Sequence, residues 1–270
     1  MIIPFVLIFI IGTLIGSFLN VVILRLNSGK SFAKGRSICM SCNKTLHAHE
    51  LVPILSYLIQ RGRCRACTNP ISVQYPIVEA FTGLIFALTA FHFLPILSLS
   101  AISYIALVSV FVLVFSFLIV IAVYDIRHKI IPDKLSYAFA LIAFVSLFIN
   151  YSFMGKIFVI PPLHMILAGP LLALPFALIW FLSKGKWMGL GDAKLTLGIG
   201  WLLGLSQGLA SLVLGFWSGA IISLIFLLLK YHKVTPKTEI PFAPFLILGV
   251  LLVFFFNLDI FSIISWFRIS

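Results

Sequence analysis

Long apolar runs separated by short polar segments dominate the chain. Eight runs are predicted to be membrane-crossing helices, at about residues 2–24, 76–94, 102–124, 134–151, 163–182, 193–205, 209–229 and 242–257. About 20 apolar residues cross a bilayer as a helix. The run at 193–205 is short for a full crossing, so it is expected to tilt or to share a tight turn with the next run. The apolar–polar alternation of a β-barrel is not visible. The pattern therefore predicts an all-α, multi-pass membrane protein.

Composition supports this class. The 270 residues are 62% hydrophobic and 10% charged, whereas a soluble chain is about 25% charged. The first run has no basic stretch before it and no small-x-small cleavage site, so we expect a retained helix and not a signal peptide.

One long polar segment interrupts the apolar pattern. It carries all four cysteines and eight basic residues. Three parts are therefore expected: a first transmembrane helix at 1–24, a cytoplasmic four-cysteine loop module at 25–75, and a seven-helix membrane domain at 76–270.

Lysine and arginine predict the orientation. If 25–75 is cytoplasmic, the loops after the third, fifth and seventh helices are cytoplasmic too. All basic residues except Lys156 and Arg268 then lie on one side, as the positive-inside rule requires, and both termini lie outside. The net charge of +12 thus faces the lipid bilayer and its anionic headgroups, and no nucleic-acid partner is expected.

Two aspartates stand out among only seven acidic residues. Asp192 follows two glycines at the start of the 193–205 run, and Asp125 closes a long uncharged run. Two crossings separate them, so both return to the same membrane face. Such carboxylates can form an acid/base pair that activates a water molecule. A helix cap explains Asp192 equally well and explains Asp133 better than catalysis does. No cap explains Asp125, because it lies at a helix C-terminus.

These positions suggest different roles. A helix N-terminus favours the charged form of Asp192, and a helix C-terminus near hydrocarbon favours the protonated form of Asp125. We therefore expect Asp192 to start as the general base.

The cysteines form two pairs, Cys39-x2-Cys42 and Cys64-x2-Cys67. This spacing favours a structural zinc ion with four thiolate ligands, and a reducing cytosol argues against disulfides. His47 and His49 lie between the pairs and are expected to be solvated. In the first run, Gly12, Gly16 and Asn20 recur every four residues, a face suited to close helix packing, with an interhelical hydrogen bond from Asn20.

Seven stretches in this order resemble the prepilin peptidases, the type IV leader peptidase family of GxGD aspartic proteases. They are 16–22 (GSFLNVV), the four-cysteine loop, 50–57 (ELVPILSY), 75–79 (YPIVE), Asp125 with 131–133 (IPD), 189–195 (GLGDAKL) and 240–245 (IPFAPF). The resemblance implies that Asp125 and Asp192 are the catalytic pair. It also implies that the substrates are secreted type IV prepilin-like proteins. These would be cut at the cytoplasmic face of the bacterial inner membrane, between a basic leader and an apolar helix.

Members of this family often also methylate the new N-terminus with S-adenosylmethionine. No GxGxxG fingerprint follows a strand here, so no cofactor-binding residue can be named. Glu79 and Glu50 match family positions, but Glu79 also suits a first helical turn and Glu50 a pair with loop arginines. Met40 stands where the family has proline.

Two other functions remain open. Another intramembrane GxGD protease would need the same two aspartates but neither the cysteine loop nor residues 16–22. A transporter or an assembly factor without catalytic activity is the third alternative. A transporter should show internal repeats and charges at the bilayer midplane, and neither is evident.

Overall fold

The computed structural model describes residues 2–29, 31–32, 34–153, 161–228 and 240–268. The chain divides into two compact units, residues 1–120 and 121–270. The division falls within one long helix, α5 (Ala101–His128), and each unit is described by itself.

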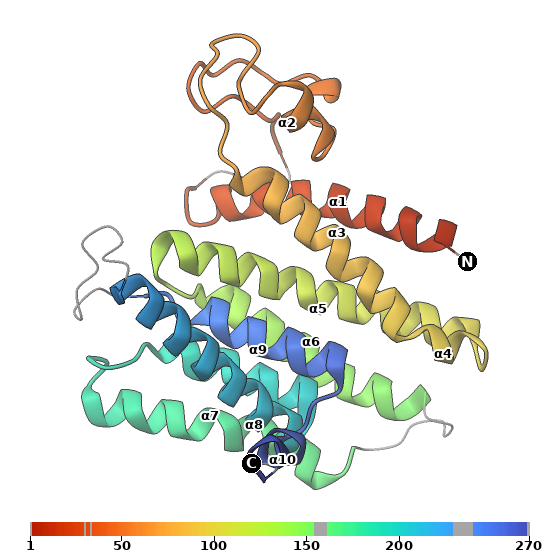
Figure 1. Cartoon of the computed structure of the whole chain (residues 1–270), viewed down its shortest axis with the longest axis vertical. Helices are drawn as coiled ribbons and strands as arrows, with labels where there is room; N and C mark the ends of the chain where they lie inside the picture. Colours follow the sequence, from red (N-terminus) through yellow and green to blue (C-terminus); the bar gives the residue numbers. More distant parts are fainter. Residues whose placement is uncertain (1, 30, 33, 154–160, 229–239, 269–270) are drawn as a thin grey trace. The chain divides into compact units, whose positions relative to one another are not determined.

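The first unit is built on a pair of long apolar helices, α1 (Ile2–Arg25) and α3 (Gln74–His92), packed along each other (Figure 1). A Cβ atom on Gly12 would lie 2.7 Å from Gly83 Cα, and one on Gly16 would lie 2.8 Å from the Cα of Glu79. The two backbones can approach this closely only because these positions lack side chains. The expected packing face is confirmed.

Asn20 makes the expected interhelical hydrogen bond. Its side chain is buried, its Nδ2 donates to Tyr75 O (3.2 Å), and its Oδ1 accepts from Gln74 Nε2 (3.1 Å). These bonds tie the end of α1 to the start of α3. The four-cysteine module leaves the helix pair and returns to it at this point.

The module contains little regular structure. It holds the 3-10 turn η1 (Ala48–Glu50) and the short helix α2 (Leu55–Ile59). Between them Ile54 has φ +61° and ψ −54°, and the Leu55 N–H bonds back to Pro53 O (2.5 Å). This is a γ-turn of the strained kind, at a β-branched residue that rarely adopts positive φ. Past α3, the unit ends in α4 (Leu94–Leu97) and the first part of α5.

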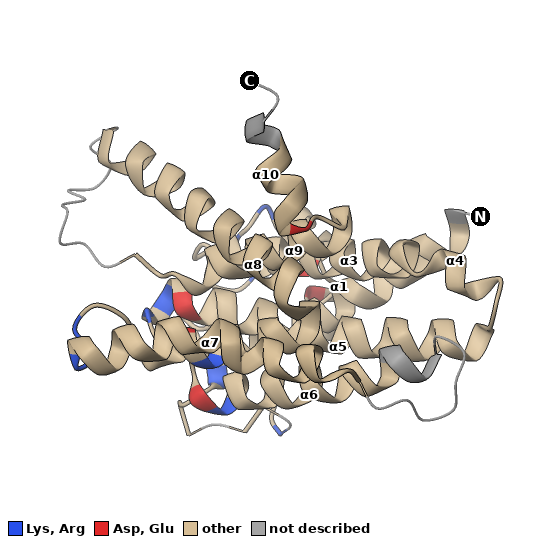
Figure 2. Cartoon of the chain, turned by 90° about the horizontal axis from the view of Figure 1, so that it is seen from below, with Lys and Arg blue, Asp and Glu red and all other residues tan. Residues whose placement is uncertain are grey.

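The second unit is a helical bundle centred on α8, whose first half is largely buried. After the last turns of α5 come α6 (Asp133–Phe153), α7 (Leu163–Ser183), α8 (Leu190–Leu228), α9 (Ala243–Phe256) and α10 (Ile260–Arg268). α8 packs against α6, α7 and α9 (Figure 1). Charged residues of this unit gather near helix ends and are sparse along the helices (Figure 2).

α8 is a helical hairpin and not one rod. Its 39 residues would extend about 58 Å if straight. Gly204 has φ +76° and ψ −178°, a conformation that favours glycine. A Cβ on Gly208 would lie 3.9 Å from Gly200 Cα, whereas eight residues along a straight helix span about 12 Å. The chain therefore reverses at Gly204, and the expected tight turn after the short 193–205 run is confirmed.

Each of the eight expected runs is helical over its described residues, and the chain is an all-helical, multi-pass membrane protein. In the part of the chain that the structure describes, five helices are long and apolar enough to cross a bilayer, namely α1, α3, α5, α7 and α8. α9, with 14 residues, is shorter than the hydrocarbon core. α10 was not expected from the sequence. The residue that could have predicted its start is Asp259, whose carboxylate accepts the Ser262 N–H (2.7 Å) as an N-cap does. Lys30, Lys156, Lys230, Lys233 and Lys237, used to predict orientation, lie outside the described residues.

Candidate active site

Asp125 lies in the last turn of α5 and is 3% exposed. Its Oδ2 accepts a hydrogen bond from the backbone N–H of Ala243 (3.1 Å), the first residue of α9. The carboxylate thus occupies the N-terminus of a helix 118 residues away in sequence. The expectation that no cap accounts for Asp125 is wrong, because the helix that it caps is distant in sequence. The available signal was Pro244, since proline is typical of a first helical turn.

Asp192 is the third residue of α8 and is 9% exposed. Its own N–H donates to Gly189 O (3.3 Å), which closes the first turn. The expected position at a helix start is confirmed. However, Asp192 lies inside the first turn and not at the residue that precedes the helix, so the ordinary N-cap interpretation does not describe it.

The two carboxylates belong to one site. They are close enough to interact electrostatically, and each lies at the start of a helix, Asp192 on its own and Asp125 on α9. A helix N-terminus stabilises negative charge, which offsets part of the cost of a carboxylate in apolar surroundings. Neighbouring carboxylates in different surroundings can hold one proton between them and serve as an acid and a base.

The hydrogen bond to Asp125 bears on the expected roles. A backbone N–H at a helix start favours the ionised form of the carboxylate that accepts it. The bond from Ala243 therefore opposes the expectation that Asp125 starts protonated. The sequence alone places Asp125 only at the unfavourable end of its own helix.

The loop before α6 packs tightly against the start of α8. A Cβ on Gly191 would lie 2.8 Å from Ile131 Cβ, whereas one on Gly189 would meet nothing closer than 3.8 Å. Lys194 Nζ joins the same two segments through an ion pair with Asp133 Oδ1 (2.7 Å). Asp133 is the first residue of α6, so it binds a cation and also lies where a helix start favours an acid.

The two glutamates differ from expectation. Glu79 is buried in the second turn of α3, not in the first, and its Oε2 accepts the Ile54 N–H (2.8 Å). Glu50 pairs with Lys44 (3.3 Å) and not with an arginine, and it also accepts the His47 N–H (2.9 Å). That backbone bond, assisted by Lys44, lowers the pKa of Glu50.

The four cysteines form one compact cluster. The Sγ atoms of Cys39, Cys42, Cys64 and Cys67 all lie within 4.8 Å of one another. Both cysteine pairs form the same turn. The carbonyl oxygen of the first cysteine accepts the N–H of the residue after the second cysteine, which is Asn43 or Thr68. The N–H of the first cysteine donates to the carbonyl oxygen of the next residue along the chain. The backbone N–H groups of Cys42 and Ser41 lower the pKa of the Cys39 thiol to about 6. Four convergent thiols with a low-pKa member can hold a thiophilic metal ion. His47 and His49 are exposed, as expected.

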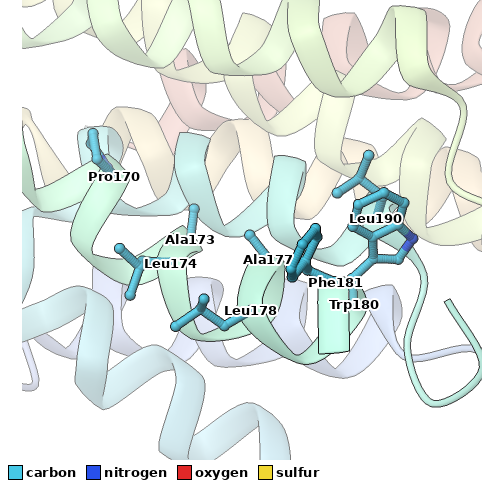
Figure 3. Close-up of a pocket in the computed structure, with 8 residues that line it drawn as sticks. All are labelled: Pro170, Ala173, Leu174, Ala177, Leu178, Trp180, Phe181 and Leu190. Carbon is cyan, nitrogen blue, oxygen red and sulfur yellow. The ribbon is translucent and has the colours of Figure 1, made fainter. Parts of the chain in front are cut away.

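An apolar groove of about 490 Å³ runs along α7 and ends at the start of α8. Figure 3 shows its lining side chains, which are Pro170, Ala173, Leu174, Ala177, Leu178, Trp180, Phe181 and Leu190. Leu190 is two residues before Asp192, so one end of the groove adjoins the aspartate site.

Two known protein-family models match the sequence of this chain. Residues 10–93 match the model of the bacterial peptidase A24 N-terminal domain, and residues 112–228 match that of the type IV leader peptidase family. A protein of Bacillus subtilis (strain 168) named prepilin leader peptidase/N-methyltransferase is 32% identical over 95% of this chain and 96% of its own. The chain belongs to the type IV leader peptidase family.

A protein of Legionella pneumophila with the same name is 32% identical over 86% of this chain and 75% of its own length. No solved structure matches the chain significantly. Asp125, before α6, and Asp192, after α7, both lie within the residues that match the type IV leader peptidase model. The four cysteines lie within the residues that match the N-terminal domain. The resemblance inferred from the sequence motifs is confirmed.

The contact between Gly191 and Ile131 leads to a paired prediction for this leader peptidase. Gly191→Ala should lower peptidase activity by about 10- to 100-fold, because displacing the start of α8 moves Asp192 relative to Asp125. Gly189→Ala is the matched control and should remain near wild type, since its Cβ meets only ordinary contacts. Equal activity of the two purified variants would contradict this explanation of the glycines.

Proposed function

We propose that this protein is an aspartic endopeptidase of the bacterial inner membrane that removes the leader from type IV prepilin-like proteins. The observation that carries the proposal is the pair Asp125 and Asp192, two buried carboxylates stabilised at two helix starts in an apolar bundle. The names of the relatives from Bacillus subtilis and Legionella pneumophila support this substrate class.

Asp125 and Asp192 divide the proton transfers between them. Asp125, held ionised by the Ala243 N–H, removes a proton from a water molecule, whose oxygen attacks the scissile carbonyl carbon. Asp192 starts protonated and donates its proton to the carbonyl oxygen as the tetrahedral intermediate forms. When this intermediate collapses, the proton held by Asp125 passes to the amide nitrogen and the C–N bond breaks. Asp192 takes back a proton from a hydroxyl group of the intermediate as the product carboxyl group forms, so both aspartates return to their starting states. This assignment reverses the roles expected from the sequence.

The proposal places the site at the cytoplasmic face. The supporting observation is the clustering of lysine and arginine in alternate loops. A substrate whose basic leader precedes an apolar helix would then present its scissile bond where that helix enters the membrane. Asp125 and Asp192, at helix ends, are suited to this depth.

The groove along α7 offers a place for the apolar helix of the substrate. Its lining is apolar, and Ala173 and Ala177 are small enough for a helix backbone to approach. A helix in this groove would bring one end close to Leu190, and therefore close to Asp192.

N-methylation of the new N-terminus with S-adenosylmethionine is part of the proposal, because the names of the relatives include this activity. None of the described residues is assigned to the methyl donor. Mass spectrometry of the N-terminus of the cleaved product tests this part, and an unmethylated product would contradict it.

We further propose that zinc occupies the four-cysteine cluster. Four thiolates leave no open coordination position, so the ion would stabilise the module and would not take part in peptide hydrolysis.

The aspartate pair makes the first prediction for this function. Asp125→Asn and Asp192→Asn should each reduce cleavage of a co-expressed pilin-like precursor by about 10²- to 10⁴-fold, as expected for loss of an acid or a base. Asp133→Asn is the matched control. It breaks an exposed ion pair worth at most about 1 kcal/mol and should leave most of the activity. Cleavage at a rate near that of the wild type by either variant of the pair would refute the proposed mechanism.

The proton assignment has its own measurement. Isotope-edited infrared spectra of the purified protein at neutral pH should show a protonated aspartic acid band. That band should persist in Asp125→Asn and disappear in Asp192→Asn. The opposite pattern would restore the roles expected from the sequence.

The groove predicts a change in substrate affinity. Ala177→Trp should fill the groove and raise KM by about 3- to 10-fold with little change in kcat, because it removes binding that is equal in ground and transition states. Ile179→Trp, on the same helix but outside the groove lining, is the control and should leave KM unchanged. A normal KM for Ala177→Trp would exclude this groove as the binding surface.

We expect about one zinc ion per purified chain, because four ligands complete one structural site. Cys64→Ser should lose the metal and make the module more sensitive to trypsin, while Met40→Ala and Asp192→Asn should keep it. Elemental analysis of the three variants tests this. Wild-type protein free of zinc, or zinc lost from Asp192→Asn, would contradict a structural zinc in the module.

A further inference from the structure

The four-cysteine module carries an apolar surface that nothing among the described residues covers. We call it the α2 surface, and it consists of Leu51, Val52, Leu55, Leu58 and Ile59. Leu58 is 62% and Ile59 is 70% exposed. Leu55, Leu58 and Ile59 are at positions i, i+3 and i+4 of α2 and therefore lie on one face of the helix. A small module does not usually leave such an apolar face in water, so this face indicates a partner.

The depth of this surface relative to α3 can be derived from one hydrogen bond. The Ile54 N–H, immediately before α2, donates to Glu79 Oε2. Glu79 is five residues past Gln74, the first residue of α3, which is about 7 Å along the helix axis.

α3 needs its full length to cross a membrane. Its 19 residues extend about 28 Å, close to the roughly 30 Å thickness of the hydrocarbon core. The Glu79 side chain leans back toward the start of α3, so its hydrogen bond holds the start of α2 near the boundary of the bilayer and not well above it. Interfacial helices lie at this boundary and insert their apolar faces about 5–10 Å.

The charges around α2 match such a position. Arg61, Arg63 and Arg65 follow the helix directly and are exposed. Basic side chains next to an apolar face are typical of segments that lie in the headgroup region of a phospholipid layer, where they bind phosphate groups.

We propose that the α2 surface is a membrane anchor. Its apolar side chains insert among the acyl chains of the leaflet on the side of the module, and Arg61 and Arg63 lie among the phosphates. The strained turn at Ile54 and the hydrogen bond from the Ile54 N–H to Glu79 hold α2 at this depth. The module is thereby attached to the membrane at its own surface as well as through α1 and α3. This inference does not depend on the proposed peptidase function.

Depth-dependent fluorescence quenching of the full-length chain in lipid nanodiscs tests the anchor. A fluorescent amino acid is placed at Leu58 or Ile59, and the lipids carry bromine atoms on their acyl chains. Met40, also on the module and 70% exposed, is the matched control outside the α2 surface. Leu84, an exposed position within α3, is the reference for contact with lipid.

Quenching at Leu58 and Ile59 should fall within about twofold of that at Leu84 and exceed that at Met40 by about fivefold, as insertion to the acyl-chain boundary requires. Quenching no stronger than at Met40 would overturn the proposal. Photo-crosslinking of position 58 to a second protein chain instead of lipid would overturn it as well.

A variant supplies the second measurement. In Leu58→Gln/Ile59→Gln, a reporter at Leu55 should lose its quenching, while Met40→Gln with the same reporter should keep it. Unchanged quenching in the double variant would show that these side chains do not hold α2 in the membrane. Quenching in the otherwise unaltered chain decides the question even if the double variant does not fold.

Discussion

A polar group buried in a membrane protein must find its partner within the chain, and this constraint shapes both units. Water is absent from the hydrocarbon region, so an unpaired carboxylate or amide there is costly. Asp125 accepts the first N–H of α9, Glu79 accepts the N–H of Ile54, and Asn20 bridges α1 and α3. Each bond places a side chain of one helix at the end of another segment. The polar groups therefore specify which segments meet in an otherwise uniform apolar chain.

The site follows from this constraint. A helix start has unsatisfied N–H groups and a positive dipole end, and both aspartates use one. Asp192 does so within its own helix, whereas Asp125 does so across the bundle. The two surroundings differ because Asp125 receives a direct hydrogen bond. In the proposed mechanism this difference lets Asp125 stay charged while Asp192 keeps a proton.

Close backbone packing is the second condition. Gly191 admits Ile131, and Gly204 lets α8 fold back on itself so that its first half is enclosed by other helices. The ion pair between Lys194 and Asp133 joins the same segments at their exposed end. A side chain at position 191 would push against Ile131 and shift Asp192 relative to Asp125. At Gly204, φ of +76° would strain any other residue.

The sequence by itself determined the class, the helices and the identity of the chemical groups. Apolar run length predicts helices, a CxxC spacing predicts four convergent thiols, and parity of crossings puts Asp125 and Asp192 on one face. It could not show that Asp125 caps α9, that Glu79 binds Ile54, or that α2 presents an apolar surface. Those facts depend on contacts between residues 118 and 25 positions apart, and local periodicity carries no information about them. Only the tertiary structure decided which carboxylate receives the hydrogen bond from Ala243, and the proposed proton assignment depends on that contact.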